Sequence, residues 1–335
     1  MTAFFINLLN WINGVVGNYG WSIVLFTLLI RMVLLPLDIK SKKSMRAMSK
    51  IQPKVQALQK QYANDKDKLN QKTMELYRKE HVSPTSGCLP LLISLPILWI
   101  MFSAMRTVGN EQTIKMILDM KETGQLPNLQ SWLWIKNVFQ PDSFGATILP
   151  MVNSTLAMIR PANGSVWLTE ENIAAAVEYL SSSDYSHLAA TLMPSSAFSV
   201  TQINLLLAQP TLLLPNSFSN LLTYANGLFI LPLLAGGSQL LMTSLMNGKK
   251  TPEQKEMEAA QKAQNQNNPM NSPIMKWFFP IFSVWICATS NAAFSIYWMA
   301  ANAIQIVQQL VVNWYFDRQD AQAAAALNPD ETENR

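Results

Sequence analysis

The sequence is short of charged residues. Asp, Glu, Lys and Arg make up 14% of its 335 residues, while hydrophobic residues make up 49%. Soluble domains carry roughly 25% charged residues, so this composition argues for a chain that faces lipid. Cysteine is also scarce: Cys88 and Cys287 stand alone in apolar segments without CxxC spacing, so we expect neither a disulfide framework nor a metal site.

Histidine is also scarce, and a phosphate-binding loop is lacking. The two histidines, His81 and His187, fall in segments expected to be aqueous, so neither can activate a serine inside the membrane. No G-x-x-x-x-G-K-[ST] motif is present. We therefore expect no catalytic residues, no cofactor and no enzyme activity. No basic residue precedes Arg31, so the positive region of a cleavable signal peptide is lacking and the N-terminal segment is expected to be retained.

Apolar residues are gathered into four blocks: Tyr19 to Leu37, Leu89 to Met105, Leu228 to Met246, and Trp277 to Phe316. Each of the first three approaches the ~20 residues that cross a bilayer as a helix. The last block is about twice that length, which suits two spans, and Ser290-Asn291 provides a polar break near its middle. The sequence thus predicts an all-α membrane protein with five transmembrane helices.

Charge placement orients these spans. Residues 40–80 carry twelve Lys and Arg against four acids, whereas residues 106–227 carry five against eight. Because Lys and Arg near span ends favour the cytoplasm, we expect the N-terminus outside and the C-terminus in the cytoplasm. The predicted segments are an outer interfacial amphipathic helix (1–17), the first span (18–38), a cytoplasmic basic helical hairpin (39–84), the second span (85–107), a long extracytoplasmic loop (108–226), the third span (227–247), a cytoplasmic loop (248–272), the fourth span (273–290), the fifth span (291–316) and a cytoplasmic tail (317–335).

Two of these segments have a simpler interpretation. The apolar and polar residues of 1–17 alternate at helical spacing, but the segment could also be a frayed extension of the first span. In the hairpin, Pro53 is expected to break the chain and Asn64-Asp65 to mark the turn between two helices. The alternative is that its basic residues only fix topology and touch anionic lipid headgroups.

Arg31 is the outstanding residue inside the predicted membrane region. A buried arginine costs at least ~2.5–3.5 kcal/mol on insertion scales, which makes it a functional candidate. Its guanidinium could instead snorkel, because six residues to Leu37 span about 9 Å of helix. Thr27 lies one turn away on the same face.

Polar residues recur on two other spans: Gln239 and Thr243 in the third, and Asn302, Gln305 and Gln309 in the fifth. Polar faces on several spans indicate a shared hydrated cavity, since polar side chains facing lipid would lack partners. Ordinary hydrogen bonds between helices are the alternative explanation for each residue taken singly.

The stretch HVSPTSGCLPLLI at residues 81–93 closely resembles the start of the second span in the YidC/Oxa/Alb family of membrane protein insertases. Ile30-Arg31 to Pro36, the segment from Gln52-Pro53-Lys54, and Ala293 to Trp298 fit the same family in the same order. The resemblance implies five spans enclosing a polar groove that is open to cytoplasm and lipid and closed outside. Arg31 matches the groove arginine and Thr27 its neighbour, and the resemblance places Gln239, Tyr297 and Trp298 in the same client-binding groove. Asn302 and Gln305 are added to this groove because they follow Trp298 at four and seven residues, on the same face of the fifth span.

The resemblance implies an insertase in the bacterial plasma membrane. It would move hydrophilic tails of client membrane proteins across the bilayer and release their helices into lipid. The Sec translocon and the ribosome are candidate partners, and we expect no specific nucleic acid. The acidic tail, with Asp317 and Asp320, does not favour ribosome binding through that tail.

The outer loop departs from the family pattern, because residues 144–226 are far longer than the expected connection. Both Ile148-Leu149-Pro150 and Ile230-Leu231-Pro232 resemble the start of the third span. We choose the second, because it continues for a full crossing.

Two other function classes fit parts of the sequence. A small transporter or channel would use Arg31 as an anion-binding residue and would have to open at its outer end, whereas an insertase groove would stay closed there. A structural scaffold would tolerate loss of Arg31.

The charge asymmetry predicts that positions near Lys60 and Lys255 are cytoplasmic and that positions near Ser182 lie outside. Labelling of single cysteines with an impermeant reagent checks this. Reaction near Ser182 only from the cytosolic side would overturn the topology.

Overall fold

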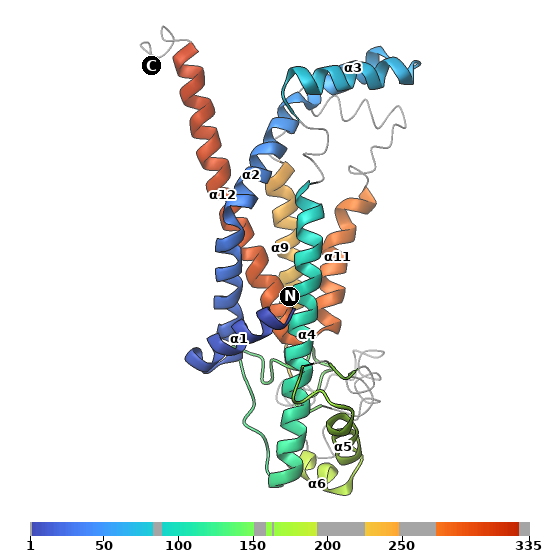
Figure 1. The fold of residues 1–335 in the computed structure, drawn as a ribbon, viewed down its shortest axis with the longest axis vertical. Coiled ribbons are helices and arrows are strands. Elements are labelled where there is room, and N and C mark those ends of the chain that lie inside the picture. Colours follow the sequence, from blue (N-terminus) through green and yellow to red (C-terminus); the bar gives the residue numbers. More distant parts are fainter. Residues whose placement is uncertain are drawn as a thin grey trace, which may run out of the picture. The chain divides into compact units, whose positions relative to one another are not determined.

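The computed structural model describes residues 2–82, 89–150, 159–162, 164–192, 225–247 and 273–327. Within these ranges the secondary structure is helical, with two isolated bridges (Trp132 to Ile135, Thr147 to Ala225) and no strand, so the all-α prediction is confirmed there. The helices, labelled in Figure 1, are α1 (Thr2–Val16), α2 (Tyr19–Gln61), α3 (Lys66–Lys79), α4 (Leu89–Thr123), α5 (Glu170–Leu180), α6 (Ser183–Leu192), α9 (Ile230–Asn247), α11 (Pro273–Thr289) and α12 (Ala292–Leu327).

Some predicted features lie outside these residues: positions 83–88 of the second-span motif, including Cys88, the loop at 248–272, and the end of the tail. Among the described helices, α2 is the one that is both long and apolar enough to cross a bilayer by length and composition. Shorter apolar helices occupy Thr2–Val16, Ile230–Leu245 and Trp277–Thr289.

The predicted break between the fourth and fifth spans is present. α11 ends at Thr289 and α12 begins at Ala292, so the break at Ser290-Asn291 is confirmed. The Asn291 side-chain oxygen accepts a hydrogen bond from the Phe294 N–H at 3.0 Å, which satisfies one of the free N–H groups of the first turn.

The N-terminal helix is separate from α2, so its interpretation as a frayed extension of the first span is wrong. α1 ends before Gly17, whose φ of 73° suits glycine, and the Gly17 N–H donates to the Asn13 carbonyl at 2.8 Å. α2 then starts with its own cap, because the Asn18 side chain accepts from the Trp21 N–H at 3.2 Å.

The expected break at Pro53 is wrong, because α2 runs without interruption from Tyr19 to Gln61 and contains Pro36 and Pro53. A proline inside a helix removes one backbone hydrogen bond, and packing can compensate: Ile51 and Val55, on either side of Pro53, are 4% and 5% exposed. The expected turn at Asn64-Asp65 is confirmed.

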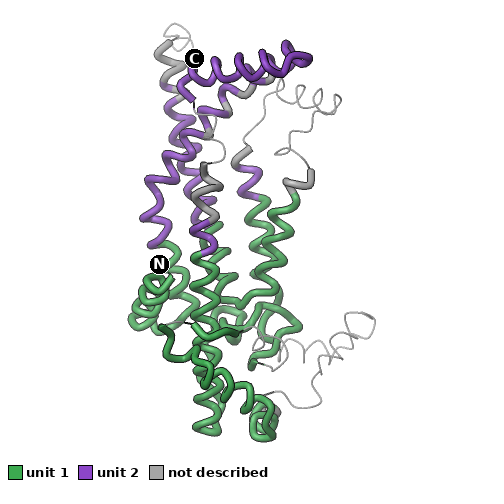
Figure 2. Tube along the Cα trace, turned by 45° about the vertical axis from the view of Figure 1, so that its right-hand side comes forward, with its two compact units in different colours: residues 1–28, 100–240, 276–302 green, residues 29–99, 241–275, 303–335 purple. Residues whose placement is uncertain are grey.

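The residues form two compact units, coloured in Figure 2. Unit 1 comprises residues 1–28, 100–240 and 276–302, and unit 2 comprises residues 29–99, 241–275 and 303–335.

In unit 1, the long outer loop includes a folded lobe. α4 continues to Thr123, beyond the predicted span end at 107, and its last turns pack against α5 and α6 (Figure 1) through a buried apolar cluster. The Tyr179 hydroxyl donates to the Met120 carbonyl at 3.2 Å, and the Tyr185 hydroxyl donates to the Pro150 carbonyl at 2.5 Å. Burial raises the pKa of Tyr185, which keeps this hydroxyl protonated as a donor.

A buried carboxylate fixes the start of α9. Asp142 is 0% exposed, and its two oxygens accept from the N–H groups of Phe229 (3.1 Å) and Leu231 (2.7 Å) and from the Trp134 indole (3.3 Å). A Cβ at Gly227 would collide with Asp142, so glycine is required there. The helix start at Ile230 supports the choice of the second Ile-Leu-Pro segment, because Ile148-Leu149-Pro150 is not helical.

We expect Asp142→Ala to destabilise the protein by roughly 2–4 kcal/mol, since three donors lose a charged acceptor in a buried site. Asp142→Asn keeps one acceptor oxygen and should cost less. Unfolding in detergent, followed by circular dichroism, measures both. Asp119→Ala removes an exposed carboxylate from α4 and is the matched control; an equal effect of Asp119→Ala and Asp142→Ala would contradict a specific role for Asp142.

Candidate functional site

Arg31 lies in unit 2, on the apolar part of α2, and its side chain is partly buried. With the Gln305 amide of α12 oriented so that its oxygen faces the guanidinium, that oxygen accepts hydrogen bonds from Nη1 and Nη2 at 2.5 and 3.1 Å. The structure thus brings together two of the predicted groove residues. Because glutamine is neutral, this contact satisfies donors of Arg31 without cancelling its charge.

Three further polar residues follow Arg31 along α2, and the sequence analysis did not identify them. Asp38 and Lys42 are partly buried and Ser41 is 8% exposed. Burial lowers the pKa of the Lys42 ammonium; Asp38 partly offsets this effect, and Arg31 lowers the pKa further. The spacing of Asp38 and Lys42 at seven and eleven residues from Arg31 is the signal that could have identified them.

The other predicted groove residues belong to unit 1, and two of them make hydrogen bonds there. Thr27 is fully buried and its hydroxyl donates to the Ile23 carbonyl at 2.6 Å. The Asn302 side chain donates to the Ser238 hydroxyl of α9 at 2.9 Å. These contacts match the alternative of ordinary hydrogen bonding for Thr27 and Asn302, so the groove role of both stays a prediction.

Tyr297 and Trp298 pack around Phe294 in unit 1, with ring centroids 6.3 and 5.5 Å from that of Phe294. Tyr297 is 5% exposed, and the Trp298 indole N–H has no hydrogen-bond partner among the residues that the structure describes. Gln239 is partly buried on α9. The client-binding role of these three residues also stays a prediction.

Buried main-chain contacts tie the loop at 135–142 to the start of α12 in unit 1. The N–H groups of Ala292 and Ala293 donate to the carbonyls of Gln140 (2.9 Å) and Val138 (2.7 Å). Asn226, which is 0% exposed, donates through its side chain to the carbonyls of Asn137, Gln140 and Pro141 at 2.9 to 3.2 Å. This loop is therefore clamped to both α12 and the segment before α9.

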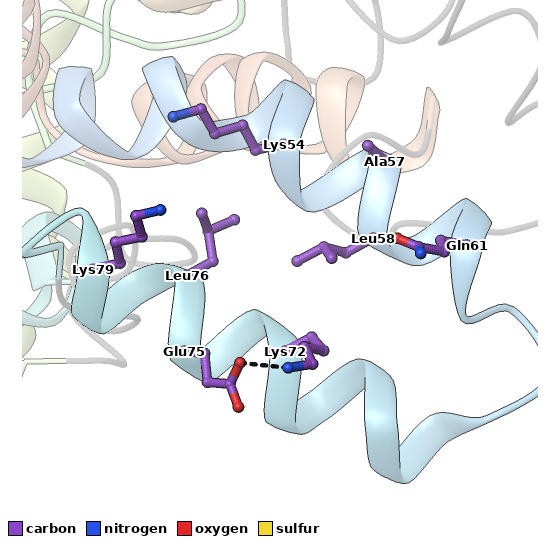
Figure 3. Close-up of a pocket in the computed structure, with 8 residues that line it drawn as sticks. All are labelled: Lys54, Ala57, Leu58, Gln61, Lys72, Glu75, Leu76 and Lys79. Atoms are coloured by element: carbon purple, nitrogen blue, oxygen red, sulfur yellow. Dashed lines mark hydrogen bonds and ion pairs between the residues drawn. The ribbon is translucent and has the colours of Figure 1, made fainter.

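The basic hairpin in unit 2 has a shallow groove of about 340 Å³ between α2 and α3, with the lining residues drawn in Figure 3. Leu58 and Leu76 point into the space between the helices, while lysines surround them. No residue of α3 is buried, so Leu58 and Leu76 form only a thin apolar seam, and Met74 of α3 lies outside it at 45% exposure. The hairpin is held together by few apolar contacts.

The sequence matches the 60Kd inner membrane protein family over residues 11–319, nearly the whole chain. The chain belongs to this family. The predicted resemblance to the YidC/Oxa/Alb insertases is thereby confirmed at the level of the family.

Three relatives align with about half of this chain. A protein of Fusobacterium nucleatum subsp. nucleatum named membrane protein insertase YidC is 40% identical over 153 residues, which are 46% of this chain and 65% of that protein. Proteins of the same name from Aromatoleum aromaticum and Legionella pneumophila are each 38% identical, over 45% and 48% of this chain but only 24% and 26% of their own lengths. The chain thus matches less than two thirds of each relative.

Proposed function

We propose that this family member is a membrane protein insertase. The observation that carries the proposal is Arg31: a partly buried cation on the apolar part of α2, held by the neutral side chain of Gln305. Keeping a guanidinium at such a position costs free energy, and attraction of anionic client groups is a role that would justify the cost. The relatives named membrane protein insertase support the same conclusion.

In this mechanism Arg31 attracts an acidic or polar tail that enters from the cytosol. A hydrated groove around Arg31 shortens the hydrocarbon path that the tail must cross. The apolar helix of the client then moves into lipid, and its burial at ~25 cal/mol per Å² supplies the driving force without a nucleotide. No bond of the client is made or broken, so the protein is not an enzyme in this proposal.

The proposed setting is a bacterial inner membrane, crossed five times with the N-terminus outside. Clients and the bilayer are the primary partners, and the Sec translocon and the ribosome are further candidates. In the proposed topology the loop that contains Val138 and Gln140 lies on the outer side, where a channel would have to open. The hydrogen bonds that tie these two residues to Ala293 and Ala292 therefore favour an insertase over a channel. They support a closed outer side.

Substitution of Arg31 tests the mechanism directly. Arg31→Lys keeps the charge and should retain much of the activity, whereas Arg31→Ala should fail most on clients with acidic tails, roughly tenfold or more. The measurement is insertion by purified protein in liposomes, with single-span clients that differ only in tail charge. Lys43→Ala removes an exposed cation from the same helix and is the control.

Equal loss for acidic and neutral tails in folded Arg31→Ala would mean that Arg31 maintains hydration or packing instead of attracting clients. No loss for either tail would favour the snorkelling alternative and remove Arg31 from the mechanism.

The hairpin should act as a client-receiving arm. Deletion of residues 53–78 should impair insertion, and Leu58→Ser with Leu76→Ser should do so while leaving every basic residue in place, because it removes the apolar seam. Insertion assays and cysteine labelling of the same variants separate activity from topology. Full activity of both variants would reduce the hairpin to a topology signal.

A further inference from the structure

Arg31, Asp38 and Lys42 lie on one face of α2. At 3.6 residues per turn, Asp38 and Lys42 are each rotated only about 20° from Arg31 around the helix axis, and they lie about 10 and 16 Å further along it. Asp38 is within electrostatic reach of both cations. The face therefore alternates positive, negative and positive charge towards the hairpin.

Four polar side-chain atoms in unit 2, three on α2 and one on α12, are buried without a hydrogen-bond partner among the described residues. They are Oδ2 of Asp38, Oγ of Ser41, Nζ of Lys42 and Oε1 of Gln308. Ser41 is itself more than nine-tenths buried. Buried polar atoms in folded proteins nearly always have partners, and exceptions call for an explanation. A bound polar ligand would supply the missing partners: a carboxylate could accept from Lys42 and Ser41, and a cationic group could donate to Asp38.

The carboxylate of Asp38 also affects the net charge of the site that such a ligand would occupy. Arg31 and Lys42 together would repel basic groups and attract acidic ones. Asp38 offsets one of these two positive charges and does so from the position between them, where the three fields overlap and screening by water is weak.

We propose that Asp38 determines the charge selectivity of the site at Arg31, so that client tails carrying basic groups can occupy the site as well as acidic ones. The occupant is the charged, hydrophilic tail of a client. This inference rests on the proposed insertase function, since it specifies which tails the same site accepts.

The test compares acidic, neutral and basic tails on matched single-span clients, inserted by the full-length protein in liposomes. Asp38→Asn should raise the ratio of acidic-tail to basic-tail insertion by roughly threefold or more, because Arg31 and Lys42 lose their counter-charge. Asp38→Glu keeps the charge and should keep the wild-type ratio. Asp317→Asn removes an exposed carboxylate of unit 2, paired with Arg46, and should leave the ratio unchanged.

An unchanged ratio in Asp38→Asn overturns the proposal, and so does an equal loss for all three tails, which would assign Asp38 to packing. A ratio that shifts only in vesicles containing anionic lipid would identify a lipid headgroup as the occupant and would also overturn it.

A second readout separates this inference from the proposed function. Titration of acidic and basic tail peptides of equal length against the protein in nanodiscs measures charge preference without insertion. If Asp38→Asn shifts this preference while no variant inserts any client, the insertase proposal fails and the role of Asp38 stands. Unshifted peptide binding beside normal insertion by the wild type contradicts the role of Asp38 alone.

Discussion

A guanidinium on an apolar helix must find acceptors, and this constraint organises the described part of unit 2. Arg31 has five N–H donors, and burying it costs at least ~2.5–3.5 kcal/mol when they face hydrocarbon. Gln305 offers one oxygen to two of its nitrogens, which requires α12 to lie against α2 at this level. Further along the same helices, Arg46 pairs with Asp317 at 2.7 Å and lies over the Phe316 ring. The two helices are therefore matched in register by arginine contacts at two levels.

Unit 1 meets a related constraint in its irregular backbone. Residues 124–169 contain no described helix, yet Asn137, Val138 and Gln140 are buried there, and buried N–H and carbonyl groups need partners. Asp142 and Asn226 provide them from side chains: one accepts from backbone N–H groups at the start of α9, and the other donates to three loop carbonyls. Asp142 thus binds N–H groups that the first turn of a helix leaves without partners, and Asn226 binds carbonyls of the irregular loop.

The features that could be predicted from sequence are those encoded locally. Asn291 and Asp65 mark chain breaks because the side chain of each caps the helix that follows, and the apolar blocks predict the long helices. The break expected at Pro53 was wrong: α2 continues through this proline, and its neighbours Ile51 and Val55 are buried by packing. The lobe of α5 and α6 and the bond from Leu231 to Asp142, 89 residues apart, depend on contacts between distant segments that no local pattern records. Arg31 was found because charge is rare in an apolar span, whereas Asp38 was overlooked because it is the last residue of the predicted first span, 18–38.

In the proposed mechanism, the chemistry of the partners of Arg31 decides whether this residue can act on a client at all. A carboxylate in direct contact would satisfy the guanidinium but would also cancel its field, leaving a structural ion pair with little attraction for anything else. Glutamine satisfies two nitrogens and leaves the full charge in place. Asp38, about 10 Å further along the helix, is close enough to moderate this field and too far along the axis to neutralise it. In the proposed mechanism, a neutral contact partner with a carboxylate at longer range would leave the charge of Arg31 uncancelled and would limit how tightly it holds an anion. An insertase needs both properties, because it must release what it binds.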